Sequence, residues 1–339
     1  MCKEEVTCGI VGIGLYFPEN VRTYKDIAEL SGIPEDVVLN KLGINRIYYP
    51  GEKDQTSEMA IWAAEDCLNR TGIDPKEIDL IIYFGENYSD YQLFSIAPKV
   101  QGKIGAVNAW CYDMECKCGS AVVALDQAKK YLMNDAGINT VMIAGGYRNV
   151  DKVDYKDNGI SFLFDVSCGG AAAIIKKGNN RRVVLENANI ADGQFAESII
   201  VPGGGSRIPF TPENINKDYL KYYRLQDPQG FRSRLAPITI KNLAKVTEMA
   251  CKKSGLSLSD ITFICPLHMK ASAHRELLGY LNLPPEKSVY LSDYGHCGQL
   301  DMLISMRNAE EKKLIKEGDV VALIAMGFGY VWNAGIVKW

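Results

Sequence analysis

The sequence predicts a layered α/β fold built from two similar halves. Stretches with helical spacing of apolar residues alternate with short, wholly apolar strands, which is typical of sheets covered by helices on both faces. Three pairs of segments also resemble each other in the same order along the chain: residues 71–82 and 254–265, 140–146 and 319–327, and 170–177 and 333–339. One such match arises easily by chance, but three in the same order indicate an internal duplication.

The expected elements of the first half follow from apolar spacing. A helix over residues 56–69 precedes the strand that ends the segment 71–82. The apolar run Ile104–Tyr112 is expected as the next strand. The residues after Cys118 have the spacing of a helix that ends at about Met133.

The second half repeats the pattern. A helix over residues 235–253 precedes a strand at Ile261–Pro266, and further helices are expected from about Ser272 and over Leu300–Leu314. The segment Val201–Pro209 contains three consecutive glycines, but no Lys-Ser or Lys-Thr follows them. We therefore expect a turn-rich loop there rather than a phosphate site.

The two halves are expected to join at the polar segment 176–182. This gives an N-terminal half of residues 1–178 and a C-terminal half of residues 179–339. Each half depends too much on the other to fold as a free module. With 339 residues, the chain is long enough to bury a large core.

Charge and hydropathy argue against several classes of protein. The 38 lysines and arginines are interspersed with 41 acidic residues, and the net charge of −3 argues against a general nucleic-acid binder. No apolar run reaches the ~18 residues of a transmembrane helix. The charged start Met1–Glu5 does not resemble a signal peptide. We therefore expect a cytoplasmic protein with no membrane insertion.

The ten cysteines are expected to be reduced, because their spacing does not match a small disulfide scaffold. Cys8, Cys67 and Cys265 lie in apolar runs and are expected as buried thiols. Cys116 and Cys118 are too close together for a zinc pair, and no second pair follows at zinc spacing. No metal site is predicted.

Cys118, His268 and His296 are the candidate reactive residues, because each follows the end of an expected strand. Cys118 also precedes a helix, whose unpaired N–H groups and dipole favour a thiolate. In open α/β sheets, functional residues gather beyond the carboxyl ends of strands, so the three residues are expected to meet. A thiol nucleophile with two imidazoles suits acyl transfer or carbon–carbon condensation on a thioester.

Other readings of these residues stay open. Cys116, Cys168 and Cys297 are rival nucleophiles, and Cys297 lies at the position that the repeat relates to Cys118. Cys118 could instead be a buried cysteine without a catalytic role. Each histidine could instead be a loop residue that only forms hydrogen bonds. His274 lies inside an expected helix and is expected to be an ordinary surface residue.

Five segments carry a resemblance to a known family: Gly9–Glu19, Lys41–Ile44, Asp113–Leu125, Gly203–Arg207 and Gly327–Trp332. In order and spacing they resemble the thiolase superfamily, and most of all its β-ketoacyl-ACP synthase III group. The resemblance spans nearly the whole chain and places Cys118, rather than its neighbour two residues before, at the nucleophile position.

The resemblance implies a thiolase-like α-β-α-β-α fold, a homodimer and a decarboxylative Claisen condensation. Cys118 would take an acyl group from a CoA or carrier-protein thioester, and malonyl-ACP or malonyl-CoA would lose carbon dioxide and attack it. His268 and His296 would hold the enolate oxygen, and the backbone N–H groups of Cys118 and Phe328 would form the oxyanion hole. Leu93 falls where a partner subunit limits the acyl pocket. The resemblance implies no cofactor; the substrates are thioesters, and an acyl carrier protein is a candidate partner in fatty-acid or polyketide biosynthesis.

The chain departs from this group in specific places. His268 is displaced by one residue from the family's Pro-His-Gln-Ala-Asn motif, and His296 stands where the group has an asparagine, which gives a Cys-His-His set. Val37 and Asn158 replace the tryptophan and arginine that often hold the CoA adenine. These replacements favour a carrier-protein donor or a different CoA pose, and no residue is assigned to cofactor binding.

Alternative functions stay open at this point. The same acyl-Cys118 intermediate would also serve acyl transfer to an oxygen or nitrogen acceptor, or non-decarboxylative condensation with a second acyl thioester. A non-catalytic ketosynthase partner is less favoured, because a scaffold has no need of the cysteine and both histidines. An oxidoreductase is disfavoured, because Gly12-Ile13-Gly14 lacks the third glycine of a dinucleotide site. The sequence does not determine the acyl chain.

Overall fold

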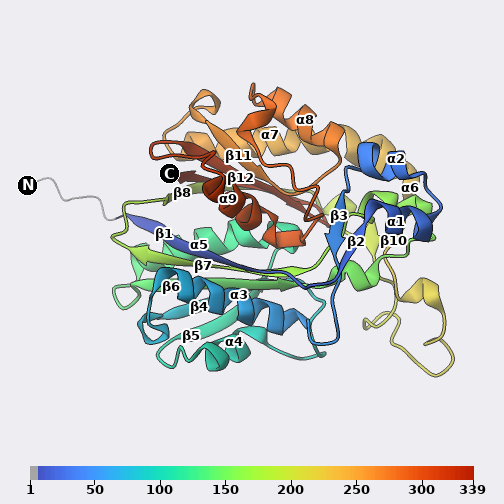
Figure 1. The fold of residues 1–339 in the computed structure, drawn as a ribbon, viewed down its shortest axis with the longest axis horizontal. Coiled ribbons are helices and arrows are strands. Elements are labelled where there is room, and N and C mark those ends of the chain that lie inside the picture. The colour runs from blue at the N-terminus through green and yellow to red at the C-terminus, as the bar shows by residue number, and fades with distance from the viewer. Residues whose placement is uncertain (1–6) are drawn as a thin grey trace, which may run out of the picture.

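Residues 7–339 are described by the computed structural model and form a stack of helical and strand layers (Figure 1). The expectation that no signal peptide is present concerns Met1–Glu5, which lie outside the described residues. Among the helices of residues 7–339, none combines the length and the apolar character that crossing a bilayer requires.

The first half contributes five strands to the central sheet: β1 (Cys8–Tyr16), β4 (Leu80–Gly85), β5 (Trp110–Glu115), β6 (Thr140–Tyr147) and β7 (Gly169–Lys177). They lie in the order β5-β4-β6-β7-β1. Strand β4 is parallel to β5 and β6, whereas β7 is antiparallel to β6 and β1.

The second half repeats this arrangement with four strands: β8 (Val183–Ala191), β11 (Phe263–Pro266), β12 (Val320–Gly327) and β13 (Val331–Lys338). Their order is β11-β12-β13-β8, with one parallel pair, where the first half has two, followed by antiparallel neighbours. Strands β1 and β8 join the two halves, with Gly9 opposite Val183. The internal duplication expected from the sequence is therefore confirmed, while the boundary at residues 178 and 179, between β7 and β8, stays a prediction.

Helices form three layers around the strands (Figure 1). Helices α3 and α4 cover the outer side of the first-half strands, α7 and α8 cover that of the second half, and α5 and α9 lie between the halves. Their bounds are α3 (Thr56–Thr71), α4 (Ile96–Ile104), α5 (Ser120–Asn134), α7 (Ala236–Lys253), α8 (Ala271–Tyr280) and α9 (Asp301–Glu311). This is the expected α-β-α-β-α arrangement.

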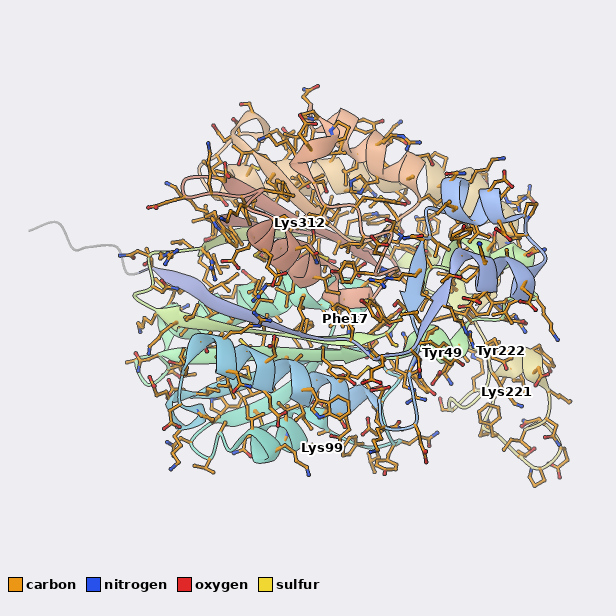
Figure 2. All side chains as sticks on the ribbon, viewed as in Figure 1. Phe17, Tyr49, Lys99, Lys221, Tyr222 and Lys312 are labelled. Carbon is orange, nitrogen blue, oxygen red and sulfur yellow. The ribbon has the colours of Figure 1, made fainter. Side chains whose placement is uncertain are left out.

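Smaller elements complete the chain. Strand β2 (Val21–Thr23) pairs with β3 (Arg46–Tyr48), and β9 (Ile199–Ile200) pairs with β10 (Arg224–Leu225). The short helices are α1 (Tyr24–Ser31), α2 (Glu35–Val37) and α6 (Pro228–Gly230). Residues 201–217 form an irregular loop that projects from the body, and Lys221 and Tyr222 mark the region where the chain returns to it (Figure 2).

Two expectations from the sequence are wrong. The run Ile104–Tyr112 is not one strand, because its first residue ends α4 and Gly105, with a φ of 77°, turns the chain before β5 begins. Ala106 and Ala109 of this turn are buried without forming a strand, whereas Val107 is exposed. His274 is buried rather than exposed, because α8 places its ring edge-on against Tyr290 with 5.1 Å between the ring centroids.

Candidate active site

Cys118 lies between the end of β5 and the start of α5, at the carboxyl edge of the first-half strands. The neighbouring parallel strand β4 ends one residue before Glu86, so the topology brings Glu86 and Cys118 to the same edge. The chain turns sharply here, with Lys117 at a φ of 49°. Ser120 fixes this turn, because its Oγ accepts a hydrogen bond of 2.7 Å from the backbone N–H of Cys116.

His296 contacts the sulfur of Cys118 across the two halves. Its Nε2 lies 3.3 Å from Sγ, and its Nδ1 lies 2.6 Å from Oδ2 of Asp301. The backbone of His296 is itself fixed, since its N–H donates to the carbonyl of Asp165 (2.7 Å) and its carbonyl accepts from the N–H of Ser167 (2.9 Å). Because an ionised carboxylate only accepts hydrogen bonds, Nδ1 carries a proton and Nε2 is free to exchange one with the thiol.

His268 belongs to the same cluster but does not pair with the thiol. Its backbone N–H donates to Oδ2 of Asp301 (2.7 Å), and its Nε2 lies 3.8 Å from Oδ2 of Asp165. Neither ring nitrogen has a hydrogen-bond partner among residues 7–339. Burial, together with the nearby histidines, lowers the pKa of His268 to about 3, so its ring is neutral at physiological pH.

Glu86 contacts Cys118 on another side. Its Oε1 lies 3.4 Å from Sγ, and its Oε2 accepts a hydrogen bond of 2.6 Å from Nδ2 of Asn149, which follows the end of β6. Cys118 and Asn149 are buried, whereas Glu86 is partly exposed. The sulfur therefore lies within reach of both an imidazole and a carboxylate.

These neighbours oppose each other electrostatically. Burial, followed by the charge of Glu86, raises the pKa of Cys118 to about 12, and His296 offsets only part of this shift. Burial also raises the pKa of Glu86. Burial disfavours a charge on His296, but Asp301 and then Cys118 raise its pKa well above the ordinary value. Burial and Glu86 therefore oppose the thiolate that the helix start was expected to favour, and Asp301 favours a proton on His296. The thiolate at Cys118 stays a prediction.

The other sequence-based candidates occupy different positions. Phe328 lies in the turn between β12 and β13, where Gly327 packs against the backbone next to Cys118. Its role in an oxyanion hole stays a prediction. Leu93 is fully exposed on the loop after β4, and its place in an acyl pocket stays a prediction.

Among residues 7–339, no hydrogen bond joins the sulfur of Cys116 or Cys297 to either histidine. The sulfur of Cys297 faces the carbonyl of Cys168 at 3.7 Å, and that of Cys116 faces Nδ2 of Asn333 at 3.8 Å. The cysteines in the described part of the chain are free thiols, and Cys118 is the one whose sulfur lies against an imidazole there.

Sequence reasoning missed four polar residues of this cluster: Glu86, Asn149, Asp165 and Asp301. The argument used for Cys118 could also have identified Glu86, because Glu86 directly follows a wholly buried parallel strand. Asp301 lies five residues after His296 at the start of α9, and no simple spacing predicts that its carboxylate turns back to the imidazole.

The duplicated layers, together with a cysteine that lies against a His–Asp pair at the carboxyl edge of the strands, are the arrangement of a thiolase-like enzyme. Two sequence models of one family match the chain: the 3-oxoacyl-[acyl-carrier-protein] synthase III model over residues 112–193, and the model of its C-terminal part over residues 251–339. Together they match about half of the chain, and the chain belongs to this family.

Curated relatives support the same family over the full length. A β-ketoacyl-[acyl-carrier-protein] synthase III of Azobacteroides pseudotrichonymphae is 28% identical over 334 residues, which covers 97% of this chain and 96% of the relative. The enzyme of that name from Caldanaerobacter subterraneus is 26% identical over 341 residues, which covers 100% of this chain and 99% of the relative.

Solved structures share the fold. The β-ketoacyl-[acyl carrier protein] synthase III of Thermus thermophilus superposes with a TM-score of 0.84 at 25% identity, over 98% of this chain and 99% of that one. The priming β-ketosynthase of the R1128 polyketide pathway reaches 0.83 at 17% identity, over 98% and 96%. The chain is thus a condensing enzyme of the acyltransferase class.

Proposed function

We propose that Cys118 carries the acyl group in a two-step condensation. An acyl-CoA or acyl-carrier-protein thioester first transfers its acyl group to Sγ. A malonyl thioester then loses carbon dioxide, and its carbanion attacks the acyl carbon to give a β-ketoacyl thioester. The single observation that carries this proposal is the contact of 3.3 Å between Sγ of Cys118 and Nε2 of His296, whose Nδ1 is bound to Asp301.

In the first step, His296 takes the proton of the thiol as Sγ attacks the donor thioester. Asp301 stabilises the imidazolium that forms, in the same way that a buried carboxylate supports the base of a hydrolase triad. The proton then passes from Nε2 to the departing thiol of CoA or the carrier protein. The raised pKa of His296 makes its neutral form a strong base for this step.

In the second step, His268 stabilises the enolate oxygen of the acceptor. Its lowered pKa keeps the ring neutral, so a ring N–H is available as a donor, and neither ring nitrogen is occupied by another residue of the described chain. Backbone N–H groups of Cys118 and Phe328 would stabilise the oxyanion on the acyl carbon. These roles stay proposals.

Intact-protein mass spectrometry tests this function. The protein is mixed with acyl-CoAs and acyl-carrier-protein thioesters from acetyl to palmitoyl, and then with a malonyl thioester. We expect a thioester adduct that is absent in Cys118→Ser and is discharged with release of carbon dioxide. An adduct that persists in Cys118→Ser, or no adduct from any donor, would contradict the proposal.

We also propose that the enzyme works as a homodimer, with an acyl carrier protein as a partner and no cofactor. The edge strand β5 supports the dimer, because Trp110 is 48% exposed and stacks with Tyr112 along the unpaired edge. In such a dimer Leu93, fully exposed in one chain, would be free to enter the acyl pocket of the other. The cytoplasmic location stays a prediction.

A further inference from the structure

Two buried tyrosines and a buried asparagine lie close to the nucleophile, where an apolar acyl chain would meet polar groups. We propose that the site selects a short acyl donor that carries a neutral oxygen, such as a hydroxyl group, on its chain. Tyr147, Tyr223 and Asn149 bind this oxygen and disfavour the chain that lacks it. The inference rests on the proposed acyl-Cys118 intermediate and adds the class of its acyl group.

Tyr147 is the last residue of β6 and lies against the imidazole that faces the sulfur. Its ring is edge-on to that of His296, with 6.2 Å between the ring centroids. Gly298 allows this position, because a Cβ added there would collide with ring carbons of Tyr147. A buried phenol is therefore fixed beside the pair of Cys118 and His296.

Tyr223 brings a second phenol to the same place from a distant segment. Its backbone N–H donates to the carbonyl of Lys152 (2.8 Å), which attaches this segment to the chain that follows β6. Its ring lies edge-on against Phe328, with 6.2 Å between the ring centroids. Tyr223 therefore lies between the end of β6 and the turn that carries Phe328.

The two phenols and the amide form one polar group of side chains. Burial, followed by the charges of Glu86 and Cys118, raises the pKa of Tyr223 well above its ordinary value, and hydrogen bonds with Asn149 and Tyr147 offset part of this rise. Burial also raises the pKa of Tyr147 well above the ordinary value. Both phenols are thus neutral at physiological pH, and a neutral phenol can donate and accept a hydrogen bond.

These groups define the chemistry of the acyl chain. A hydroxyl on the chain can exchange hydrogen bonds with a phenol, whereas a purely apolar chain would shield the phenols from water without replacing their partners. An acyl chain with a carboxylate is disfavoured as well, because the carboxylate of Glu86 lies 3.4 Å from Sγ of Cys118 and accepts a hydrogen bond from Asn149. A neutral, oxygen-bearing chain fits best.

Aromatic rings behind Tyr223 favour a short chain. Phe328 and Tyr330 lie with 5.8 Å between their ring centroids, and Tyr330 is 6.0 Å from the fully buried Trp332. A long acyl chain in this direction would have to displace packed rings, which costs stability in a close-packed interior.

The test compares donors of equal length that differ in one group. Butyryl-CoA, 3-hydroxybutyryl-CoA and the anionic succinyl-CoA are each mixed with the protein, and the rate of acyl-Cys118 formation is followed by intact mass. We expect 3-hydroxybutyryl-CoA to acylate about 10–10²-fold faster than butyryl-CoA, because a site that binds a hydroxyl discriminates against the analogue without it. Succinyl-CoA should be slower than 3-hydroxybutyryl-CoA.

Tyr223→Phe keeps the ring against Phe328 and removes only the hydroxyl group. It should abolish most of the preference by slowing 3-hydroxybutyryl-CoA, while the rate with butyryl-CoA stays the same or rises. Tyr222→Phe is the matched control, because this neighbouring tyrosine is partly exposed, and it should retain the wild-type preference.

The outcomes separate this inference from the proposed function. Equal rates with butyryl-CoA and 3-hydroxybutyryl-CoA in the wild type would overturn the inference, while acyl-Cys118 would still form. A Tyr223→Phe protein that loses both rates alike would also overturn it, because the hydroxyl would then act only on the fold. Failure of every donor to acylate Cys118 would overturn the proposed function itself.

Discussion

Asp301 connects the residues that carry the proposed chemistry. Its carboxylate accepts hydrogen bonds from Nδ1 of His296 and from the backbone N–H groups of His268 and Cys297. It is fully buried, so these contacts are shielded from water. One aspartate thus orients both histidine-bearing loops and raises the basicity of the imidazole that faces the sulfur.

We predict that Asp301→Asn slows acylation of Cys118 by about 10²–10⁴-fold at pH 7. The amide keeps the size of the side chain but lacks the charge that raises the pKa of His296. Acyl-enzyme formation is followed over time by intact mass, at several pH values. The pKa of His296 should fall in the variant, and nitrogen NMR of labelled imidazole would show it.

Asp293→Asn is the control for Asp301, because Asp293 lies on the same loop but is exposed. It should acylate at the wild-type rate. The prediction would be contradicted if the Asp301→Asn protein melted at the wild-type temperature and also acylated normally. His296 would then not need the carboxylate, and the proposed set of Cys118, His296 and Asp301 would lose its basis.

At the scale of elements, the contact between α3 and the sheet depends on glycine. A Cβ on Gly170 of β7 would collide with the backbone carbonyl of Met59, and one on Gly146 of β6 would collide with that of Thr56. The helix therefore lies directly on β6 and β7, the strands that continue the sheet from β4.

We predict that Gly170→Ala lowers the free energy of unfolding by about 1–3 kcal/mol, because backbone atoms must move to admit the methyl group. Urea denaturation measures the change. Gly102→Ala in α4 is expected to have the opposite effect on stability, because a Cβ added at Gly102 would meet no atom within 4 Å. There the helix should gain about 0.5–1 kcal/mol from the loss of glycine. Equal effects of the two variants would contradict this account of the packing.

At the scale of the whole molecule, the unpaired edge of β5 is the region most suited to form an interface with a second copy of the chain. Exposed edges pair readily with other strands unless something covers them. Trp110, Tyr112 and Tyr131 form an aromatic cluster there, with 5.5 Å between the ring centroids of Trp110 and Tyr112. A hydrophobic edge of this kind favours a subunit interface.

We predict that wild-type protein is a dimer in light scattering and that Trp110→Glu shifts it to monomer, because a charge on the edge opposes pairing of strands. Trp62→Phe, on helix α3 and outside the cluster of Trp110, serves as a control for loss of a tryptophan and should leave the dimer intact. Monomeric wild-type protein at all concentrations would contradict the prediction.

The sequence by itself determined the duplicated architecture and identified Cys118 as the candidate nucleophile. Apolar strands alternate with amphipathic helices. These patterns can be read segment by segment, because each segment's own apolar residues must be buried. The expected helix at 235–253 corresponds to α7, and the expected strand at Ile261–Pro266 overlaps β11. Cys118 was identified from its place between a strand and a helix, which is also a local property.

Only the tertiary structure decided which polar groups surround the sulfur. Glu86 is 32 residues from Cys118 and His296 is 178 residues away, and their contacts arise from the parallel pairing of β4 with β5 and from the packing of the two halves. The protonation of each group depends on these contacts, because burial and neighbouring charges shift a pKa in ways that no segment encodes alone. The sequence therefore located the candidate nucleophile, and the packing of the two halves decided which polar groups contact its sulfur.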